Sequence, residues 1–243
     1  MTGFVTPTLG ARRSVVVTGV AKSGQLGDFV ARAFAARGDH VSIVARSQEA
    51  AEERAAQMRT DGLDVHPFAC DLANPDATAH LATLVRASAG RVDVLINLAG
   101  GFAMSGPVAE SDPVAWTQQL SLNLGTAYAT TRAFLPALRE SRGSIVFVAS
   151  AAAMPGARVE NTAAYAIAKS GVLTLMRAVA QEEQACGVRA NAIAPGSIRT
   201  HHNVAAMPDG TKFVEPEAVA DAMRFLCSPA AAQVTGQVIE LTG

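Results

Sequence analysis

The sequence predicts a single-domain α/β fold in which helices cover both faces of a doubly wound parallel sheet. Short β-branched runs alternate with alanine-rich helical stretches along most of the chain, and α/β folds follow this order. The runs are almost continuously apolar rather than alternating, as expected for strands that are buried on both faces. No linker or change in composition divides the chain, so we expect one domain over residues 13–243 after a loose tail at residues 1–12.

Seven strands and six helices are expected in chain order. The strands are predicted at residues 14–18, 40–45, 64–69, 92–97, 143–149, 188–193 and 236–241. The helices are predicted at about residues 25–37, 47–60, 75–88, 113–139, 162–185 and 216–227. The connections between these elements are short, as in doubly wound folds.

Composition narrows the classes of function. The chain has 243 residues, of which 49% are apolar, and a net charge of −1. It is long enough for a full core and has no basic patch that would favour nucleic acid. The chain has no run of 18 apolar residues, so no membrane span is expected. Cys70, Cys186 and Cys227 are odd in number and far apart, which favours reduced thiols and a cytoplasmic protein.

A tyrosine and a lysine at helical spacing are the first candidates for chemistry. Tyr165 and Lys169 lie four positions apart on a predicted helix, so they share a face. Asn161 or Thr162 is the expected N-cap of that helix. A cation about 5 Å from a phenol, at an effective dielectric of about 20, favours the phenolate by roughly 3 kcal/mol. The pair therefore predicts a tyrosine that exchanges protons near neutral pH; a surface tyrosine beside a solvated lysine is the alternative.

A glycine-rich turn follows the first predicted strand and opens the first helix. Glycine lets the backbone approach a pyrophosphate, which a helix N-terminus attracts. A simple tight turn is the alternative interpretation. The candidate cofactor contacts in the turn are Gly19, Lys22, Ser23, Gly24 and Leu26.

The end of the second predicted strand indicates which dinucleotide is preferred. An acidic residue at this point usually binds the ribose hydroxyls of NAD, whereas an arginine accommodates the 2′-phosphate of NADP. Here Ala45 supplies no acid and Arg46 supplies a cation, with Lys22 as a possible second. We therefore expect NADP(H), with NAD(H) second, although a solvated arginine at a strand end would look the same.

Taken in order, the motifs resemble the short-chain dehydrogenase/reductase family over about residues 13–243. Beside the glycine turn, they are Asp71-Leu72, Asn97-Leu98-Ala99-Gly100, Asn123, Ser150, Tyr165, Lys169 and Pro195-Gly196. The resemblance implies an NAD(P)(H)-dependent oxidoreductase with a Rossmann-type fold and a seven-stranded parallel sheet. It also implies a homodimer or homotetramer.

The resemblance implies a role for each of these residues. Those expected around the adenosine are Asp71, Leu72, Asn97, Ala99 and Gly100. Those expected near the nicotinamide carboxamide are Pro195, Gly196, Ile198 and Thr200. In the catalytic set, Asn123 would break a helix and hold a water, and Ser150 would polarise the substrate carbonyl. Tyr165 would exchange the proton, and Lys169 would bind the nicotinamide ribose.

Three features depart from the family pattern. The glycine turn is two residues longer than usual, with Gln25 in place of a glycine. Ser150 and Tyr165 are fifteen positions apart, slightly more than is common. Only residues 197–214 separate the sixth strand from the last helix, which predicts a short lid and an open site. That lid is similar to the dihydropteridine-reductase-like branch of the family.

The leading interpretation is an oxidoreductase that interconverts a carbonyl and an alcohol of a small molecule. Reduction of a C=C or C=N bond, or a non-catalytic dinucleotide sensor on the same fold, are the alternatives. No metal is expected, because His201 and His202 have no third ligand at a suitable spacing. The apolar positions of the helices at 113–139 and 162–185, including Leu120, Leu124, Leu173 and Leu175, predict a two-fold homo-oligomer.

Overall fold

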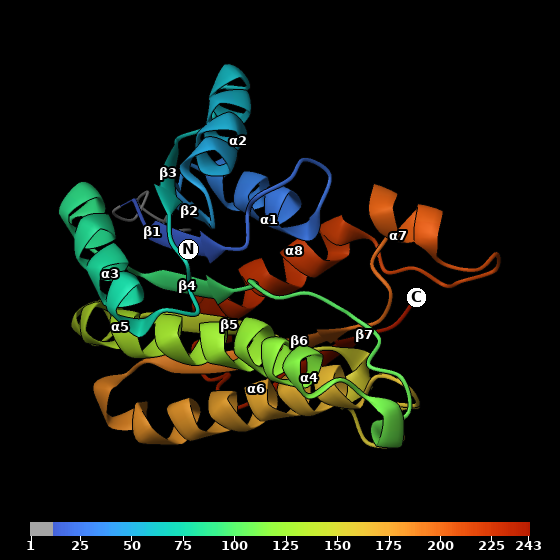
Figure 1. Cartoon of the computed structure of the whole chain (residues 1–243). Coiled ribbons are helices and arrows are strands. Elements are labelled where there is room, and N and C mark those ends of the chain that lie inside the picture. Colours follow the sequence, from blue (N-terminus) through green and yellow to red (C-terminus); the bar gives the residue numbers. More distant parts are fainter. Residues whose placement is uncertain (1–11) are drawn as a thin grey trace, which may run out of the picture.

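Seven parallel strands form one sheet in the order β3-β2-β1-β4-β5-β6-β7 (Figure 1). The computed structural model describes residues 12–243, so the predicted tail lies almost wholly outside the described residues. The predicted doubly wound fold with a seven-stranded parallel sheet is confirmed. That residues 13–243 form a single domain stays a prediction. The strands are β1 (Ser14–Thr18), β2 (His40–Ala45), β3 (Val65–Ala69), β4 (Val94–Asn97), β5 (Ser144–Val148), β6 (Arg189–Pro195) and β7 (Val238–Leu241).

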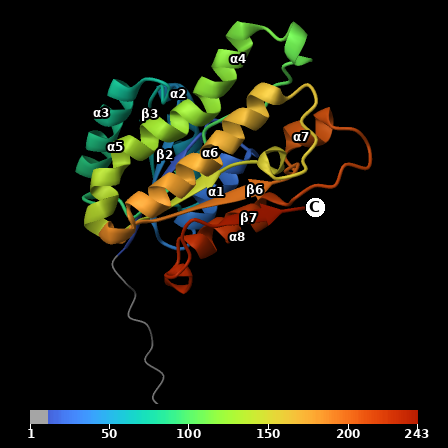
Figure 2. The ribbon, with the colours of Figure 1, turned by 90° about the horizontal axis from the view of Figure 1, so that it is seen from below.

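Helices cover both faces of the sheet (Figures 1 and 2). On one face lie α1 (Leu26–Ala35), α2 (Gln48–Thr60) and α8 (Pro216–Leu226). On the other lie α3 (Pro75–Ala89), α5 (Thr126–Ser141) and α6 (Ala163–Glu182). Each layer has its own cluster of buried aliphatic and aromatic side chains. The strands are therefore apolar on both sides, which explains their continuous apolar runs.

The chain reverses direction across the sheet between β1 and β4. Starting from β1 it winds outward through β2 and β3, and then returns to β4 and winds the other way through β7. In such folds the ligand crevice lies beyond the carboxyl ends of the strands at this reversal. The loops that follow β1, β4, β5 and β6 therefore border this crevice.

The predicted helix at 113–139 is interrupted. It consists of α4 (Pro113–Leu120), a π-helical turn at Ser121–Gly125, and α5. A π turn adds one residue per turn and widens the helix, often at functional positions. Asn123 lies in this turn, which agrees with the expected break at that residue.

Two further local expectations differ from the structure. The chain after β6 contains a six-residue helix, α7 (His201–Ala206), that sequence reasoning did not predict. Thr162 stands at the N-cap of α6, but its side chain makes no capping hydrogen bond there. Its hydroxyl instead donates to the Val159 carbonyl at 3.1 Å, because the preceding turn places that oxygen within reach.

Helix α6 is long and apolar enough to cross a membrane by length and composition alone. Half of it is buried inside the molecule, where it packs on the second face of the sheet. It packs against β5, β6 and α4, which accounts for its apolar character.

Candidate active site

A cavity of about 400 Å³ opens at the carboxyl ends of β4, β5 and β6. Three of the four predicted catalytic residues, Ser150, Tyr165 and Lys169, line it together. The rest of the lining is mostly apolar or backbone: Gly100, Gly101, Phe102, Val148, Ala149, Ala151, Ala152, Pro195, Gly196, Ser197, Ile198, Asn203 and Met207. In the part of the chain that the structure describes, Lys169 is the only charged residue of this lining.

Lys169 projects from α6 into the cavity and is 5% exposed. Its ammonium donates to the Val148 carbonyl at the end of β5, with Nζ 2.8 Å from the oxygen. Burial lowers the pKa of Lys169 from 10.5 to about 8, because a charged ammonium loses hydration there. The residue is thus held in place by one backbone acceptor and has donors left for a ligand.

Tyr165 lies one helical turn before Lys169, and its ring is 5.9 Å from the lysine Nζ. Burial raises the pKa of Tyr165 above its ordinary value of 10, and a hydrogen bond with Ser150 opposes this with a smaller effect. The net shift is therefore opposite to the lowering expected from Lys169, and that lowering stays a prediction for the cofactor-bound enzyme. The ammonium lies over the Tyr165 ring and bonds to the Val148 carbonyl.

Ser150 follows β5 and begins a short 3₁₀ turn at Ala151–Ala153. Its hydroxyl accepts a hydrogen bond from the Ala152 amide at 3.2 Å, which fixes its side chain. The Phe102 ring packs edge-on against Tyr165, at 5.1 Å between centroids and 84° between planes. The phenol therefore has a hydroxyl and an aromatic ring as neighbours.

Asn123 connects the π turn to the loop after β4. Its side-chain nitrogen donates to the Gly101 carbonyl at 2.9 Å, and its oxygen accepts from the Gly101 amide at 3.1 Å. A Cβ at Gly100 would lie 2.6 Å from the Asn123 oxygen and 3.4 Å from the Lys169 ammonium. Only glycine fits there, so the loop passes directly over the lysine. Asn123 is 1% exposed and supports the site without lining the cavity.

The glycine turn packs tightly against neighbouring loops. A Cβ at Gly19, whose φ is +79°, would lie 2.9 Å from the Ala99 Cα, and one at Gly27 would lie 2.6 Å from the Gly19 carbonyl oxygen. The Gly24 amide donates to the buried Asp28 carboxylate at 3.1 Å. The close approach of backbone at Gly19 and Gly27 fits the cradle that a dinucleotide needs beside a helix N-terminus.

The predicted adenosine contacts lie at the same edge of the sheet. Arg46 at the end of β2 and Lys22 in the glycine turn are both exposed, as is Asp71 after β3. Leu72 is buried beside Asp71. Exposed cations next to the turn suit a phosphorylated ribose.

Asn97 has a positioning role that its sequence motif did not reveal. Its amide donates to Thr131 at 2.9 Å and accepts from Thr130 at 2.6 Å, so it anchors α5 to the end of β4. Thr18, in contrast to Asn97, was not among the predicted site residues. Its hydroxyl accepts from the amides of Leu98 and Ala99, each at 3.0 Å, and holds the loop that borders the expected ribose.

The segment after β6 forms the remaining wall. The Gly196 amide donates to Leu241 at 2.9 Å, which fixes the expected carboxamide loop to β7. Thr200 is buried, and its hydroxyl caps α7 by accepting from the Asn203 amide at 3.2 Å. Asn203, which sequence reasoning missed, donates to the Ile198 carbonyl at 2.8 Å and lines the cavity.

Helix α7 brings His201 over the glycine turn. A Cβ at Gly24 would lie 3.4 Å from the His201 Nδ1. Among residues 12–243, the cluster of side chains that could together hold a metal ion is His40, Asp64 and His66, at the other end of the sheet. His201 and His202 are not part of it.

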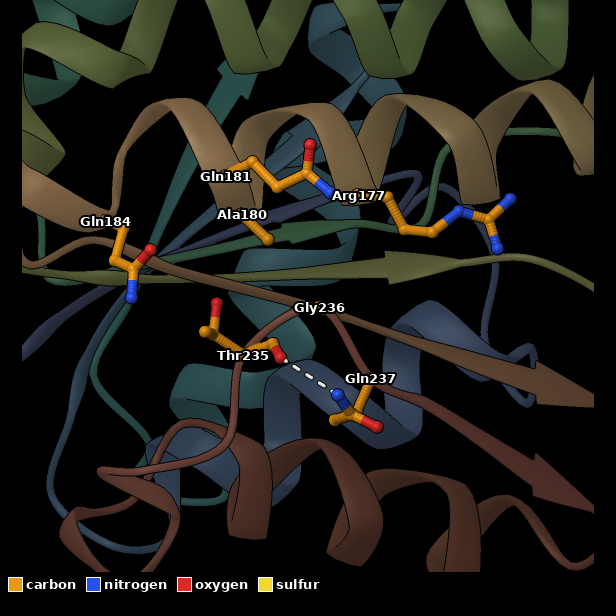
Figure 3. A pocket seen from close by; sticks show the side chains of 7 residues that line it. All are labelled: Arg177, Ala180, Gln181, Gln184, Thr235, Gly236 and Gln237. Carbon is orange, nitrogen blue, oxygen red and sulfur yellow. Dashed lines mark hydrogen bonds between the residues drawn. The ribbon is translucent and has the colours of Figure 1, made fainter.

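A second, smaller hollow of about 270 Å³ lies between α6 and the start of β7 (Figure 3). Arg177 is its one charged lining residue within the described range, and the polar groups are those of Gln181, Gln184, Thr235 and Gln237. The Gln237 amide is engaged with the Thr235 carbonyl at 3.1 Å. This lining contains none of the predicted catalytic residues.

The family model for short chain dehydrogenases matches residues 13–209. The chain belongs to the short-chain dehydrogenase/reductase family. D-threitol dehydrogenase of Mycolicibacterium smegmatis is 32% identical over 240 residues, which cover 94% of this chain and 90% of that protein. Cis-4-hydroxycyclohexanecarboxylate dehydrogenase of Sinomonas cyclohexanicum is 32% identical over 244 residues, with 96% of each chain covered.

Solved structures agree with this assignment. An actinorhodin polyketide ketoreductase crystallised with NADPH superposes with a TM-score of 0.86 at 27% identity, and the match covers 96% of each chain. Short-chain dehydrogenases/reductases bind a nicotinamide cofactor and act as oxidoreductases on small molecules. This chain is therefore an oxidoreductase of that family.

Proposed function

We propose that this short-chain dehydrogenase/reductase interconverts a carbonyl and an alcohol, with NADP(H) as the hydride carrier and Tyr165 as the general acid and base. The observation that supports the proposal is the convergence of Tyr165, Ser150 and Lys169 in one cavity at the strand ends. When bound, the nicotinamide cofactor supplies or accepts the hydride. The residues of the chain bind and orient the substrate oxygen and move the proton.

In the reductive direction, the Ser150 hydroxyl donates to the substrate oxygen while Tyr165 gives it a proton. Because burial raises the pKa of Tyr165, the phenol is protonated at neutral pH and ready to act as an acid. In the oxidative direction Tyr165 must first lose that proton. Alcohol oxidation should therefore gain rate as the pH rises, and carbonyl reduction should not.

The cofactor preference follows from charge. Arg46 and Lys22 are exposed beside the glycine turn, and Ala45 supplies no carboxylate for ribose hydroxyls. Lys169 would hold the nicotinamide ribose with the donors that Val148 leaves free. The segment Pro195–Thr200 would border the carboxamide, and Asp71 and Leu72 with the loop 97–100 would border the adenosine.

The mostly apolar cavity favours a substrate with an apolar body around the reacting oxygen. Lys169 is the charged group of the described lining, and it is proposed to hold the nicotinamide ribose. Relatives are named for D-threitol and for cis-4-hydroxycyclohexanecarboxylate, so hydroxyl compounds belong in the first screen. Reduction of a C=C or C=N bond is the second candidate, favoured by the short segment between β6 and α8.

We also propose a cytoplasmic homo-oligomer. Tyr128 on α5 and Ile167 on α6 are about half exposed, and these two helices lie side by side (Figure 2). Leu173, expected at the interface, is instead buried within the chain. Leu124 packs inside the chain against Gly171, where a Cβ would lie 2.8 Å from the leucine side chain. A monomeric mass by light scattering at micromolar concentration would refute the oligomer.

The direct test is cofactor turnover. NADPH oxidation should be measured with ketones, aldehydes and quinones, and NADP⁺ reduction with the two alcohols above. The proposal predicts turnover on at least one carbonyl–alcohol pair that Ser150→Ala strongly reduces while cofactor binding is retained. A protein that binds NADPH but turns over no member of the panel would favour the sensor alternative.

A further inference from the structure

Two histidines and an aspartate lie together at the amino end of the sheet, opposite the active site. His40 is the first residue of β2, Asp64 immediately precedes β3, and His66 is the second residue of β3. Val41 is the register partner of Val65, so His40 and Asp64 lie side by side. Alternation along the strand puts Asp64 and His66 on one face.

The ligand atoms are close enough to share one ion. The His66 Nε2 is 2.8 Å from Asp64 Oδ1, and the His40 Nδ1 is 3.3 Å from Asp64 Oδ2. One candidate ligand atom from each residue lies within 4.8 Å of the other two. Two ligands of a tetrahedral ion with bonds of about 2.0–2.2 Å are separated by about 3.3–3.6 Å. To hold one ion, the two stacked imidazole rings must turn so that a nitrogen of each faces the ion in the plane of its ring.

The surroundings leave the imidazoles available. The two rings stack with centroids 4.0 Å apart and planes inclined by 23°. The His40 Nε2 is buried, and no partner for it exists among residues 12–243. Within the described residues, the polar contact of the His40 ring is therefore the one between its Nδ1 and Asp64.

The site is enclosed on one side and open on the other. The side chains of His40, His66 and Asp64 are 16%, 34% and 36% exposed, so an ion could enter and keep a water as its fourth ligand. Both strands belong to a packed sheet, which fixes the three Cα positions. Imidazole and carboxylate together suit zinc and its neighbours in the first transition row.

We propose that His40, Asp64 and His66 form a binding site for a divalent first-row transition ion, with Zn²⁺ as the best match. The bound ion joins the edge strand β3 to β2. Arg12 competes with the ion for Asp64. The Arg12 guanidinium pairs with the Asp64 carboxylate and also donates to the Gly38 carbonyl at 3.0 Å. The site is independent of the catalytic cavity and of the proposed reaction.

The test is a Zn²⁺ titration of untagged, chelator-treated protein against a chromophoric chelator. Wild type should bind one equivalent tightly, and His66→Ala should weaken that binding by about tenfold or more. His80→Ala is the matched control, because His80 is an exposed histidine on α3 outside the cluster. His202→Ala controls for the adjacent pair on α7. Equal affinity in wild type and His66→Ala, or a loss confined to His202→Ala, would overturn the proposal.

Two further measurements keep the result interpretable if one variant folds poorly. Arg12→Ala should tighten Zn²⁺ binding, since it removes the cation that competes for Asp64; weaker binding in this variant would contradict Asp64 as a ligand. Co²⁺ should give the intense visible absorption of a tetrahedral site in wild type and His80→Ala, and not in Asp64→Asn. Added Zn²⁺ should raise the Tm of wild type and leave that of His66→Ala unchanged.

Discussion

At the amino end of the sheet charged side chains pair with one another, whereas at the carboxyl end a buried ammonium is held by a carbonyl alone. Arg13 binds Asp39 at 2.7 Å, and Arg139 binds Glu183 at 2.6 Å. Lys169 has Val148 O as its acceptor, and burial brings its pKa down to about 8. These two pairs contribute to the stability of the fold, and neither lines the cavity that holds Tyr165 and Ser150.

The difference indicates where stability and function are separated. A buried charge without a counter-ion is costly for folding, and here it stands in the cavity that also holds Tyr165 and Ser150. Changes at the carboxyl end should therefore alter turnover and cofactor binding. Changes at the amino end should alter unfolding and leave the chemistry in place.

The largest effect is expected from Tyr165→Phe. The variant removes the hydroxyl proposed to carry the proton and keeps the ring that packs against Phe102, so kcat should fall by roughly 10²–10⁴ with little change in cofactor affinity. Tyr128→Phe is a matched control, because Tyr128 is the chain's other tyrosine and is half exposed on α5. Steady-state kinetics and NADPH fluorescence measure the two quantities. Near-wild-type reduction by Tyr165→Phe would disprove the assignment of the acid.

Lys169→Met tests the energetic side of the comparison. The pKa of Lys169 is about 8 in the folded chain, compared with 10.5 for an ordinary lysine. Between these two pH values, Lys169 is protonated in the unfolded chain and mostly deprotonated in the folded chain. The penalty for the buried charge is fully present below about pH 8. The free energy of unfolding of wild type should rise by about 3 kcal/mol as the pH increases through this interval.

Urea unfolding on both sides of that interval measures the rise. Lys169→Met should lack it, while NADPH binding and turnover both weaken because a cofactor donor has been removed. Parallel curves for wild type and variant would show that Lys169 is not the group responsible.

Arg46→Asp should change the cofactor without changing the chemistry. We expect wild type to bind NADPH about tenfold more tightly than NADH, and the variant to reverse that order. Arg37→Asp is the control at the opposite end of the same strand, since Arg37 is also exposed and just precedes β2. Fluorescence titrations with both cofactors decide the matter. Equal affinities in wild type would mean that Arg46 is only a solvated side chain.

The smallest effect on activity is expected from Arg139→Ala. The variant leaves the buried Glu183 carboxylate without its bidentate partner, so Tm should fall while kcat stays unchanged. The hydrogen bond from Arg139 lowers the pKa of Glu183. The Arg139–Glu183 pair stabilises the fold fully at a pH above the ordinary carboxyl pKa. The stabilisation is lost as the pH falls through the lowered pKa of Glu183. The Tm difference between wild type and variant should therefore shrink in acid, as thermal scans can show.

The pattern of alternation between strand and helix was enough to predict the sheet, because apolar runs and helical periodicity are local properties. Tyr165 and Lys169 at helical spacing, and Ser150 after a strand, were likewise visible in the chain. Their meeting in one cavity follows from the sheet order, since parallel strands place the loops after β4, β5 and β6 at the same edge.

Tertiary structure alone decided what depends on distant neighbours. The pKa of Tyr165 rises because of burial, which the spacing to Lys169 does not encode. Thr18 and Asn97 became positioning residues only when β1, β4 and α5 met. The cluster of His40 with Asp64 and His66 joins residues far apart in the chain through the register of β2 and β3. Sequence patterns report periodicity along one chain segment, whereas burial, electrostatics and register arise from segments that only folding brings together.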